Sequence, residues 1–421
     1  MSNVIAASST SQDGAFAFYE KLGPKGRRTF WACTTGFAMD AMDFMIFPLI
    51  IGTLIAVWRI DPKTAGGIAT VTLWSSACGG WAAGFLADRL GRVRIMQLSI
   101  LMFSLGSLLS AVAQDPLQLT VFRSILGFGF GGEAAVASVA LSEIVDPKHR
   151  GRAMGSYTAS YALGWGAAVL LQAVIFTVLP AEIAWRALFG VGAIPALLIL
   201  FIRRNVEEPA ISSAMQQSEV PASILSIFAP AQIAATLRGA LLTIGVQGGT
   251  YSITVWIPQF LRAERKISII GSTPYLLVVI GGSFTGYLVG GWLADRFGRR
   301  FVFMASSICA SALVYGYTHV EFSDSLMLVL GFPLGFFASA YYSAVLPFLN
   351  ESFPTRLRGG GVGFTYNAGR AVGSVFPFLI GAVSAQMPLG DAISLFAIIS
   401  FGLMLIVSLT IRETNGDELT S

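Results

Sequence analysis

Five ionisable side chains stand inside long apolar stretches of the sequence, and they are the residues from which we expect chemistry: Asp40, Asp43, Arg123, Glu133 and Arg370. An ionisable group in apolar surroundings must be paired, neutralised by a proton or turned towards water, because an isolated buried charge is unfavourable. The pattern therefore indicates proton transfer or the binding of a charged ligand at these positions.

Asp40 and Asp43 are the candidates for holding a proton. They are three residues apart, so on a helix they share one face, which Phe47 continues, with Cβ atoms about 5–6 Å apart. Two carboxylates this close repel each other, and the pair can therefore hold one proton. In the alternative interpretation, one aspartate pairs with an arginine and only holds helices together.

Arg370 is the candidate for binding an anion. Asn367 and Tyr366 precede it by three and four residues and Ser374 follows by four, so they lie on nearly the same helical face. A guanidinium presents a planar fork of donors that matches a carboxylate, and the neighbouring amide and hydroxyls would orient the rest of the ligand. The alternative is a structural salt bridge from Arg370 to one of the two aspartates.

Arg123 and Glu133 share one apolar stretch but cannot pair with each other, because ten residues of helix put them about 15 Å apart along the axis. Arg123 is one of the earliest residues of the stretch, so it either extends to the membrane surface or contributes to the ligand site. Glu133 follows Gly131 and Gly132, small residues that let another helix approach closely. It is either a protonatable group in a cavity or the buried partner of an arginine or of the backbone.

Further polar side chains in the apolar stretches are candidates for the wall of a ligand cavity. We group them with Arg370, Asn367 and Arg123 as candidate substrate contacts, although an aromatic residue on a helix also has a packing interpretation. They are Tyr157, Tyr161, Gln247, Tyr251, Tyr341 and Tyr342.

The composition identifies the elements that position these residues as membrane-spanning helices. Hydrophobic residues make up 54% of the 421-residue chain and charged residues only 12%, which is about half the charged fraction of a soluble domain. Trp58, Trp185 and Trp256 stand near the ends of apolar stretches and are interpreted as anchors at the membrane surface. A span needs about 20 mostly apolar residues, and twelve stretches qualify: 30–57, 65–87, 95–114, 117–144, 153–179, 185–202, 238–261, 271–294, 301–319, 325–349, 360–386 and 392–411. The predicted fold is an all-α membrane protein with two bundles of six helices.

A charged motif between spans is repeated, which indicates two related halves. Residues 84–92 recur as 291–299, 207 residues later, and a second unit recurs 208 residues later, from Glu143 to Glu351. Internal duplication is typical of transporter folds. The five buried charges have no counterpart in the other half, which suits the binding of one substrate and one proton. We assign the repeated residues to a gating scaffold, in which the glycines are expected to permit close packing and a tight turn: Gly84, Asp88, Arg89, Gly91, Arg92, Glu143 and Arg150, and then Gly291, Asp295, Arg296, Gly298, Arg299, Glu351 and Arg358.

The distribution of basic residues predicts the orientation. The loops with the repeated motif hold many more Lys and Arg than the loops on the opposite side, so these loops, both termini and the central linker are expected to face the cytoplasm of a bacterial cell with the chain in its inner membrane. The net charge of +4 arises from these loops and does not indicate nucleic-acid binding. The predicted domains are an N-terminal tail (1–29), a first bundle (30–203), a linker (204–237), a second bundle (238–412) and a C-terminal tail (413–421).

Together these motifs resemble those of the major facilitator superfamily. The resemblance rests on the repeated Gly-x-x-x-Asp-Arg-x-Gly-Arg loop, the glycine-rich segment from Arg123 to Glu133 and the unit from Glu143 to Arg150, and it covers most of the chain. The segment from Asp40 to Phe44 is similar to those of metabolite, sialate and aromatic-acid:proton symporters. The resemblance implies the import of a small organic anion, in particular a carboxylate, driven by protons.

Other functions are left open by the sequence. A proton-driven exporter of drugs or metabolites would use the same fold, an uncoupled facilitator would need no proton site, and a sensor would bind ligand without moving it. The chain has no phosphate-binding loop, metal-ligand spacing or nucleophile elbow, so an enzyme, a cofactor and a metal are not expected. The expected partners are a small organic anion, protons and the lipid bilayer, with the protein acting as a monomer.

Overall fold

The computed structural model describes residues 17–90, 92–145, 150–203, 224–320 and 323–414, which form helices and turns without any strand. The predicted spans are confirmed, and the tenth and eleventh are each divided in two, as α12 with α13 and α14 with α15. In chain order the helices are α1 (Ala17–Lys21), α2 (Pro24–Trp58), α3 (Pro62–Leu90), α4 (Arg92–Ala111), α5 (Pro116–Ile144), α6 (Arg150–Val178), α7 (Ala181–Arg203), η2 (Ile224–Phe228), α9 (Ile233–Ala263), α10 (Thr273–Phe297), α11 (Arg299–His319), α12 (Asp324–Ala340), α13 (Tyr342–Ser352), α14 (Thr355–Gly373), α15 (Val375–Val383) and α16 (Leu389–Thr410).

Local sequence signals explain where several helices begin and break. At the start of α3, the Asp61 carboxylate accepts a hydrogen bond from the Thr64 amide at 2.8 Å, and Asp115 caps α5 in the same way. The eleventh span breaks at Ser374. Pro377 has no amide hydrogen with which to continue the helical bonding of Gly373, so a break here is expected.

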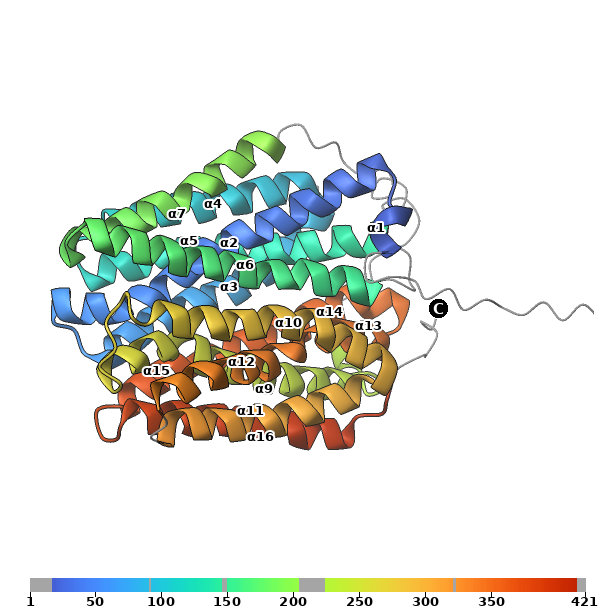
Figure 1. Ribbon diagram of the computed structural model, residues 1–421. Coiled ribbons are helices and arrows are strands. Elements are labelled where there is room, and N and C mark those ends of the chain that lie inside the picture. Colours follow the sequence, from blue (N-terminus) through green and yellow to red (C-terminus); the bar gives the residue numbers. More distant parts are fainter. Residues whose placement is uncertain (1–16, 91, 146–149, 204–223, 321–322, 415–421) are drawn as a thin grey trace, which may run out of the picture.

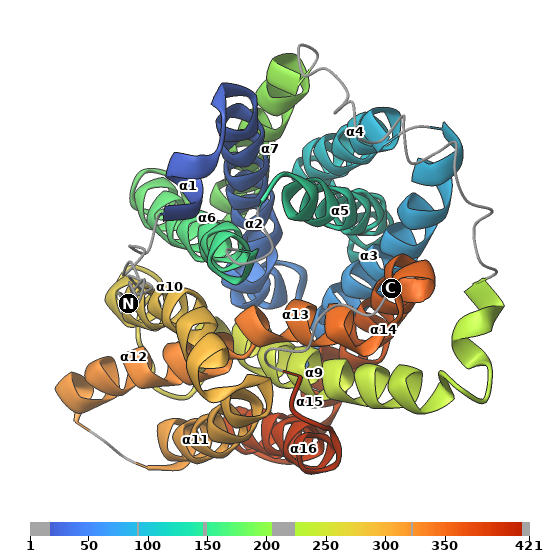
Figure 2. The ribbon, with the colours of Figure 1, turned by 90° about the vertical axis from the view of Figure 1, so that its right-hand side faces the viewer.

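The helices form two bundles of six spans, α2 to α7 and α9 to α16, which are separated in both views (Figure 1 and Figure 2). Between the bundles, α6 packs against α10, α3 against α14 and α15, and α2 against α9. By length and composition, seven helical segments of the described residues are suited to cross a membrane, among them α2, α10 and α16. The short α1 and the C-terminal end of α16 lie at the same end of the molecule (Figure 1).

The internal repeat is visible in the packing of the helices. A Cβ atom on Gly127 of α5 would collide with the carbonyl of Thr72 on α3, and one on Gly335 of α12 would collide with the carbonyl of Val279 on α10. Gly335 follows Gly127 by 208 residues. The equivalent helix pairs of the two halves therefore approach each other closely in the same way.

Two of the three predicted tryptophan anchors lie inside the protein. Trp185 and Trp256 are completely buried, so their interpretation as anchors at the membrane surface is wrong. Trp185 packs edge-on against Trp58, with ring centroids 5.2 Å apart. Trp256 donates from Nε1 to the carbonyl of Pro377 at 3.1 Å, because α9 continues to Ala263 and carries this residue inward against α15.

The second copy of the repeated turn is held by a network of charges. Arg299 donates from Nη1 to Asp295 Oδ1 at 2.9 Å and from Nη2 to Glu351 Oε1 at 3.2 Å, which ties α11 to α10 and α13. Glu413 follows α16 and accepts hydrogen bonds from the backbone amides of Arg299 (2.9 Å) and Arg300 (3.0 Å). This carboxylate caps the N-terminus of α11 and fastens the end of the last span to the turn.

The turn in this second copy is tight, since Gly298 has a φ of +94°. Gly291 is buried, Arg296 lies over the ring of Trp292 at 5.2 Å, and Arg358 donates to the carbonyl of Asn350 at 3.0 Å. In the first copy, a Cβ atom on Gly84 would meet no described atom within 4 Å, so the close packing expected there is not found. The remaining predicted gating residues of this copy lie outside the described residues or have side chains that are not described: Asp88, Arg89, Gly91, Arg92, Glu143 and Arg150.

Three hydrogen bonds join the two bundles at the end opposite the repeated turns. Thr70 of α3 donates to the carbonyl of Ser374 (2.6 Å) and accepts from the amide of Phe378 (3.2 Å), at the junction of α14 and α15. Arg262 near the end of α9 donates to the hydroxyl of Thr53 on α2 (3.5 Å). The two bundles are therefore in direct contact at this end of the molecule.

Candidate functional site

Arg370 lies at the boundary between the two bundles, in the last turn of α14 before the break at Ser374, and only 6% of its surface is exposed. Its guanidinium lies over the ring of Tyr366 at 5.4 Å and over the ring of Phe130, from the other bundle, at 5.7 Å. Tyr251 and Tyr342 lie near enough to Arg370 to interact with it electrostatically. The buried Nε of Arg370 has no hydrogen-bond partner among the described residues, so this cation keeps a donor for a ligand.

Tyrosines from five helices lie at this site, and four of them (Tyr161, Tyr251, Tyr342 and Tyr366) interact electrostatically with Arg370. A phenol ring offers flat apolar surface together with a hydroxyl that donates and accepts hydrogen bonds. The predicted contacts on α6, α9 and α13 are therefore brought together with Arg370, in a tyrosine ring composed of Tyr161 (α6), Tyr251 (α9), Tyr287 (α10), Tyr342 (α13) and Tyr366 (α14).

Gln247 of α9 lies beside this ring with 1% of its surface exposed. Its Nε2 donates to the carbonyl of Tyr366 at 2.7 Å, and its Oε1 accepts from the hydroxyl of Tyr251 at 2.8 Å. In this structure the amide therefore binds two neighbours of Arg370.

Three other predicted contacts lie outside the tyrosine ring. The amide of Asn367 lies against Gly80 of α3, at the contact between the bundles. Tyr341, at the junction of α12 and α13, is completely buried. Tyr157 stacks on Phe37 with ring centroids 4.6 Å apart and belongs to the apolar cluster beneath α1.

Asp43 and Arg123 form a second polar centre, inside the first bundle. Asp43 is completely buried, accepts a hydrogen bond from the hydroxyl of Ser107 at 2.7 Å and interacts electrostatically with Arg123. Arg123 is 1% exposed and donates from Nη2 to the carbonyl of Phe44 at 3.3 Å. Because Arg123 points into the bundle, the alternative in which it extends to the membrane surface is excluded. Asp43 faces this arginine of its own bundle, and a salt bridge from Asp43 to Arg370 is not formed.

The other two predicted acids are less fully defined. Asp40 is buried on α2, about one turn before Asp43, with 1% of its surface exposed. The side chain of Glu133 lies outside the part of the chain that the structure describes. No group of three His, Cys, Asp or Glu side chains among the described residues has the arrangement of a metal site.

Two stacked phenylalanine rings separate the two arginines. Phe44 of α2 and Phe130 of α5 lie parallel, with ring centroids 4.6 Å apart and an interplanar angle of 18°. Arg123 lies over Phe44 at 5.9 Å, and Arg370 lies over Phe130 at 5.7 Å. Since cations are attracted to the faces of aromatic rings, the stack forms a contiguous path from the first bundle to the second.

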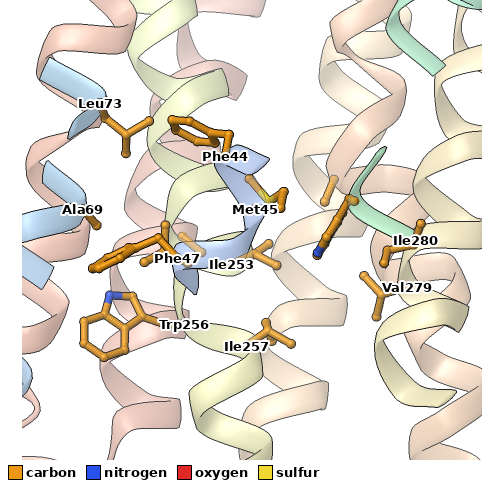
Figure 3. Close-up of a cluster of buried hydrophobic side chains, with 14 of the residues drawn as sticks. Phe44, Met45, Phe47, Ala69, Leu73, Ile253, Trp256, Ile257, Val279 and Ile280 are labelled. Carbon is orange, nitrogen blue, oxygen red and sulfur yellow. The ribbon is translucent and has the colours of Figure 1, made fainter. Parts of the chain in front are cut away.

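An apolar cluster lies between the Arg370 site and the end at which the bundles are hydrogen-bonded. Along α9, Tyr251 is followed by Ile253 and Trp256 and then by Arg262. Figure 3 shows Trp256 next to Phe47 of α2, together with side chains of the neighbouring helices. This packing lies between the tyrosine ring and the end of the molecule at which Thr70 and Arg262 join the two bundles.

Sequence reasoning missed two residues of the site, Phe130 and Tyr287. Phe130 lies in a glycine-rich segment, where the small neighbours were the more obvious feature. Tyr287 stands between Gly286 and Gly290 in the eighth span. A single polar aromatic between glycines at bilayer depth was a signal that could have identified it.

Comparisons with known proteins give one consistent family. The model of the Major Facilitator Superfamily matches residues 32–290 and 276–420. A probable 4-methylmuconolactone transporter of Cupriavidus pinatubonensis is 37% identical over 402 residues, which cover 95% of this chain and 94% of that protein. The cis,cis-muconate transport protein of Acinetobacter baylyi is 27% identical, covering 91% of this chain and 94% of that protein.

A solved structure has the same fold. The inward open conformation of the xylose transporter XylE from E. coli superposes with a TM-score of 0.73 and covers 94% of this chain and 98% of that one. The sequences are only 15% identical, so this likeness concerns the arrangement of the helices.

Proposed function

Because the chain belongs to the Major Facilitator Superfamily, and is thus a multi-pass membrane transporter and not an enzyme, we propose that it is a proton-coupled symporter. It imports a small organic anion, specifically a carboxylate, across the bacterial inner membrane. The similarity to a probable 4-methylmuconolactone transporter and to a cis,cis-muconate transport protein supports an organic anion as the substrate.

The observation that carries the proposal is the environment of Arg370. It is a buried cation at the boundary between the bundles, its Nε has no hydrogen-bond partner among the described residues, and tyrosines of four helices interact with it electrostatically. A carboxylate would accept hydrogen bonds from the guanidinium and provide the counter-charge. The flat body of the substrate would pack against the phenol rings. Tyr161, Tyr251 and Tyr342 would contact the substrate, whereas Asn367 and Tyr341 would shape the site from its edge.

Asp43 and Arg123 are the proposed proton-coupling pair, with Asp40 and Glu133 as further carboxyl groups on the proton route. When Asp43 is charged, it neutralises Arg123 within the first bundle. When Asp43 takes up a proton, Arg123 loses its counter-charge, and its interactions with Phe44 and its neighbours change. The stacked rings of Phe44 and Phe130 would transmit that change towards Arg370, which lies over the second ring.

Transport would follow from rocking of one bundle against the other around this midplane site. The bundles proposed to move are residues 30–203 and 238–412, joined by the linker 204–237. We place the repeated turns and both tails (1–29 and 413–421) on the cytoplasmic side. The hydrogen bonds of Thr70 and Arg262 would then close the outer side, and the charge network of Arg299 would stabilise the cytoplasmic turn. A single chain contains the whole site, so we propose that the monomer is functional.

The ligand class can be tested by thermal unfolding of the purified protein. cis,cis-Muconate is expected to raise the midpoint of unfolding, because a ligand that binds only the native state stabilises it by mass action. Its dimethyl ester, which has the same skeleton but no carboxylate, is expected to leave the midpoint unchanged. An equal shift with acid and ester would show that charge is not recognised and would remove the basis of the proposal.

A further inference from the structure

We propose that Arg262, near the end of α9, is a capture residue for the transported anion. While the two bundles are in contact at this end, Arg262 lies between them. When they separate, its guanidinium binds the incoming carboxylate before Arg370 does, so that Arg262 forms an entry site. This inference rests on the proposed function, in which this end of the molecule faces outwards.

Arg262 crosses the boundary between the bundles and packs against α2. Its Nη1 donates to the hydroxyl of Thr53 at 3.5 Å. A Cβ atom on Gly52 would lie only 3.0 Å from the same Nη1 and would collide with Oε1 of Gln259. The absence of a side chain at Gly52 therefore lets two side chains of α9 lie directly against the backbone of α2.

The charge of Arg262 is not neutralised at this boundary. In the part of the chain that the structure describes, its guanidinium forms no ion pair and only the one hydrogen bond to Thr53. Two nearby acids in the sequence have other partners. Glu264 accepts from the backbone amides of Leu389 and Gly390 at the start of α16, and Asp61 caps α3. A half-buried guanidinium without a carboxylate partner is a site for an anion.

The contact that holds Arg262 is weak, so the guanidinium can be released. Its bond to Thr53 is longer than the usual range for a donor nitrogen and an acceptor oxygen. Beside it, the buried Oε1 of Gln259 has no hydrogen-bond partner among the described residues, so the closed contact leaves an acceptor unsatisfied. Pro258 has no amide hydrogen to continue the helical bonding, which lets the last turn of α9 bend.

The position of Arg262 along α9 suits an entry site. Eleven residues of helix separate it from Tyr251 of the tyrosine ring, which is about 16 Å along the axis. The apolar cluster around Trp256 lies between the two (Figure 3) and offers no partner to a carboxylate. At the same boundary, Lys63 of α3 lies over the ring of Phe378 of α15 at 5.6 Å and adds a second positive charge. An anion from outside would therefore meet these cations first.

The KM for external cis,cis-muconate tests the inference, measured as initial uptake by intact bacterial cells, in which the outer side is defined. Arg262→Gln is expected to raise this KM about tenfold at low ionic strength, because positive charge at an entrance concentrates an anion there. The effect should fall to about twofold or less when ionic strength rises from about 0.01 M to about 0.15 M, since the Debye length falls from about 30 Å to about 8 Å. Arg262→Lys keeps the charge and should remain within about twofold of the wild type.

Thr53→Val separates capture from closure of the outer side. It removes the hydroxyl that Arg262 binds, but it keeps the cation and nearly the same side-chain volume. If Arg262 only held the outer side closed, both Arg262→Gln and Thr53→Val would favour the outward-open state and lower the external KM. The inference predicts instead that KM rises in Arg262→Gln and does not rise in Thr53→Val.

Arg265→Gln is the matched control. Arg265 is another arginine at the end of α9, but it donates to the carbonyl of Val320 at 2.8 Å, within its own bundle, and its loss should leave the external KM unchanged. An external KM of Arg262→Gln that is unchanged, lowered, or raised equally at both ionic strengths would overturn the inference. Failure of the proposed function is recognised separately, by an Arg370→Gln variant with the KM of the wild type.

Discussion

Replacing Arg370 with Gln is expected to lower the affinity for the transported carboxylate at least about thirtyfold, the loss typical when one partner of a buried charge pair is removed. Glutamine keeps two N–H donors but provides no charge to offset the burial of an anion. The quantity to measure is the dissociation constant of cis,cis-muconate, by calorimetry or by binding of labelled ligand to the purified protein.

Two further variants show whether the loss of affinity comes from the charge of Arg370, from its planar guanidinium or from the removal of a buried arginine in general. Arg370→Lys keeps the charge without the planar fork and should bind with an affinity between those of the wild type and Arg370→Gln. Arg186→Gln removes a half-buried arginine outside the tyrosine ring, which donates within the first bundle to the carbonyl of Ala111 at 3.1 Å, and should bind as the wild type does. A folded Arg370→Gln variant with unchanged affinity would contradict the assignment of the anion site.

Replacing Asp43 with Asn is expected to abolish proton-driven accumulation of substrate while exchange of substrate down its own gradient continues. The amide oxygen can still accept the hydrogen bond from Ser107, but the side chain can neither carry a negative charge opposite Arg123 nor take up a proton. The measurement is uptake into proteoliposomes against a substrate gradient, compared with counterflow in the same preparation.

This variant leaves Arg123 buried without its counter-charge, which would cost about 3 kcal/mol of stability. The combination Asp43→Asn with Arg123→Met removes both charges and should recover stability, because Met packs well among aromatic rings. It should still fail to accumulate substrate. Asp61→Asn, at the exposed cap of α3, keeps the capping oxygen and should leave uptake intact. If the Asp43→Asn variant accumulated substrate at the rate of the wild type, the transported proton would have to bind to a group other than Asp43.

The charged centres of the site could be predicted from the sequence because a charge in an apolar span is conspicuous. Arg370, Asp43 and Arg123 were identified in this way, and the repeat predicted the two-bundle fold. What the sequence does not contain is the rotation of each helix about its axis. The sequence could not show whether Arg123 points into the bundle or extends to the membrane surface, because this depends on the rotation of α5. In the structure, Arg123 is 1% exposed and points into the bundle.

The aromatic contacts were the least predictable part of the site. The chain has 31 phenylalanines, and nothing in the sequence distinguishes Phe130 from the others. Its proposed role depends on its contacts with Phe44 of α2 and with Arg370 of the other bundle. Trp256 was misinterpreted because its distance from the end of the apolar stretch did not reveal that α15 would cover it. Gln247 was predicted as a substrate contact, and its hydrogen bond to the carbonyl of Tyr366 depends on the packing of α14 against α9, which the sequence does not show.

The central claim is that proton and organic anion enter together, and proton flux in proteoliposomes tests it most directly. A pH-sensitive dye is enclosed in the lumen, no pH gradient is imposed, and an inward gradient of cis,cis-muconate is applied. Vesicles with Arg370→Gln report any passive permeation of the acid. The account predicts that the lumen acidifies with the wild type, in proportion to the substrate taken up, and does not acidify with the variant. Substrate uptake by the wild type without acidification beyond that of the variant would contradict it.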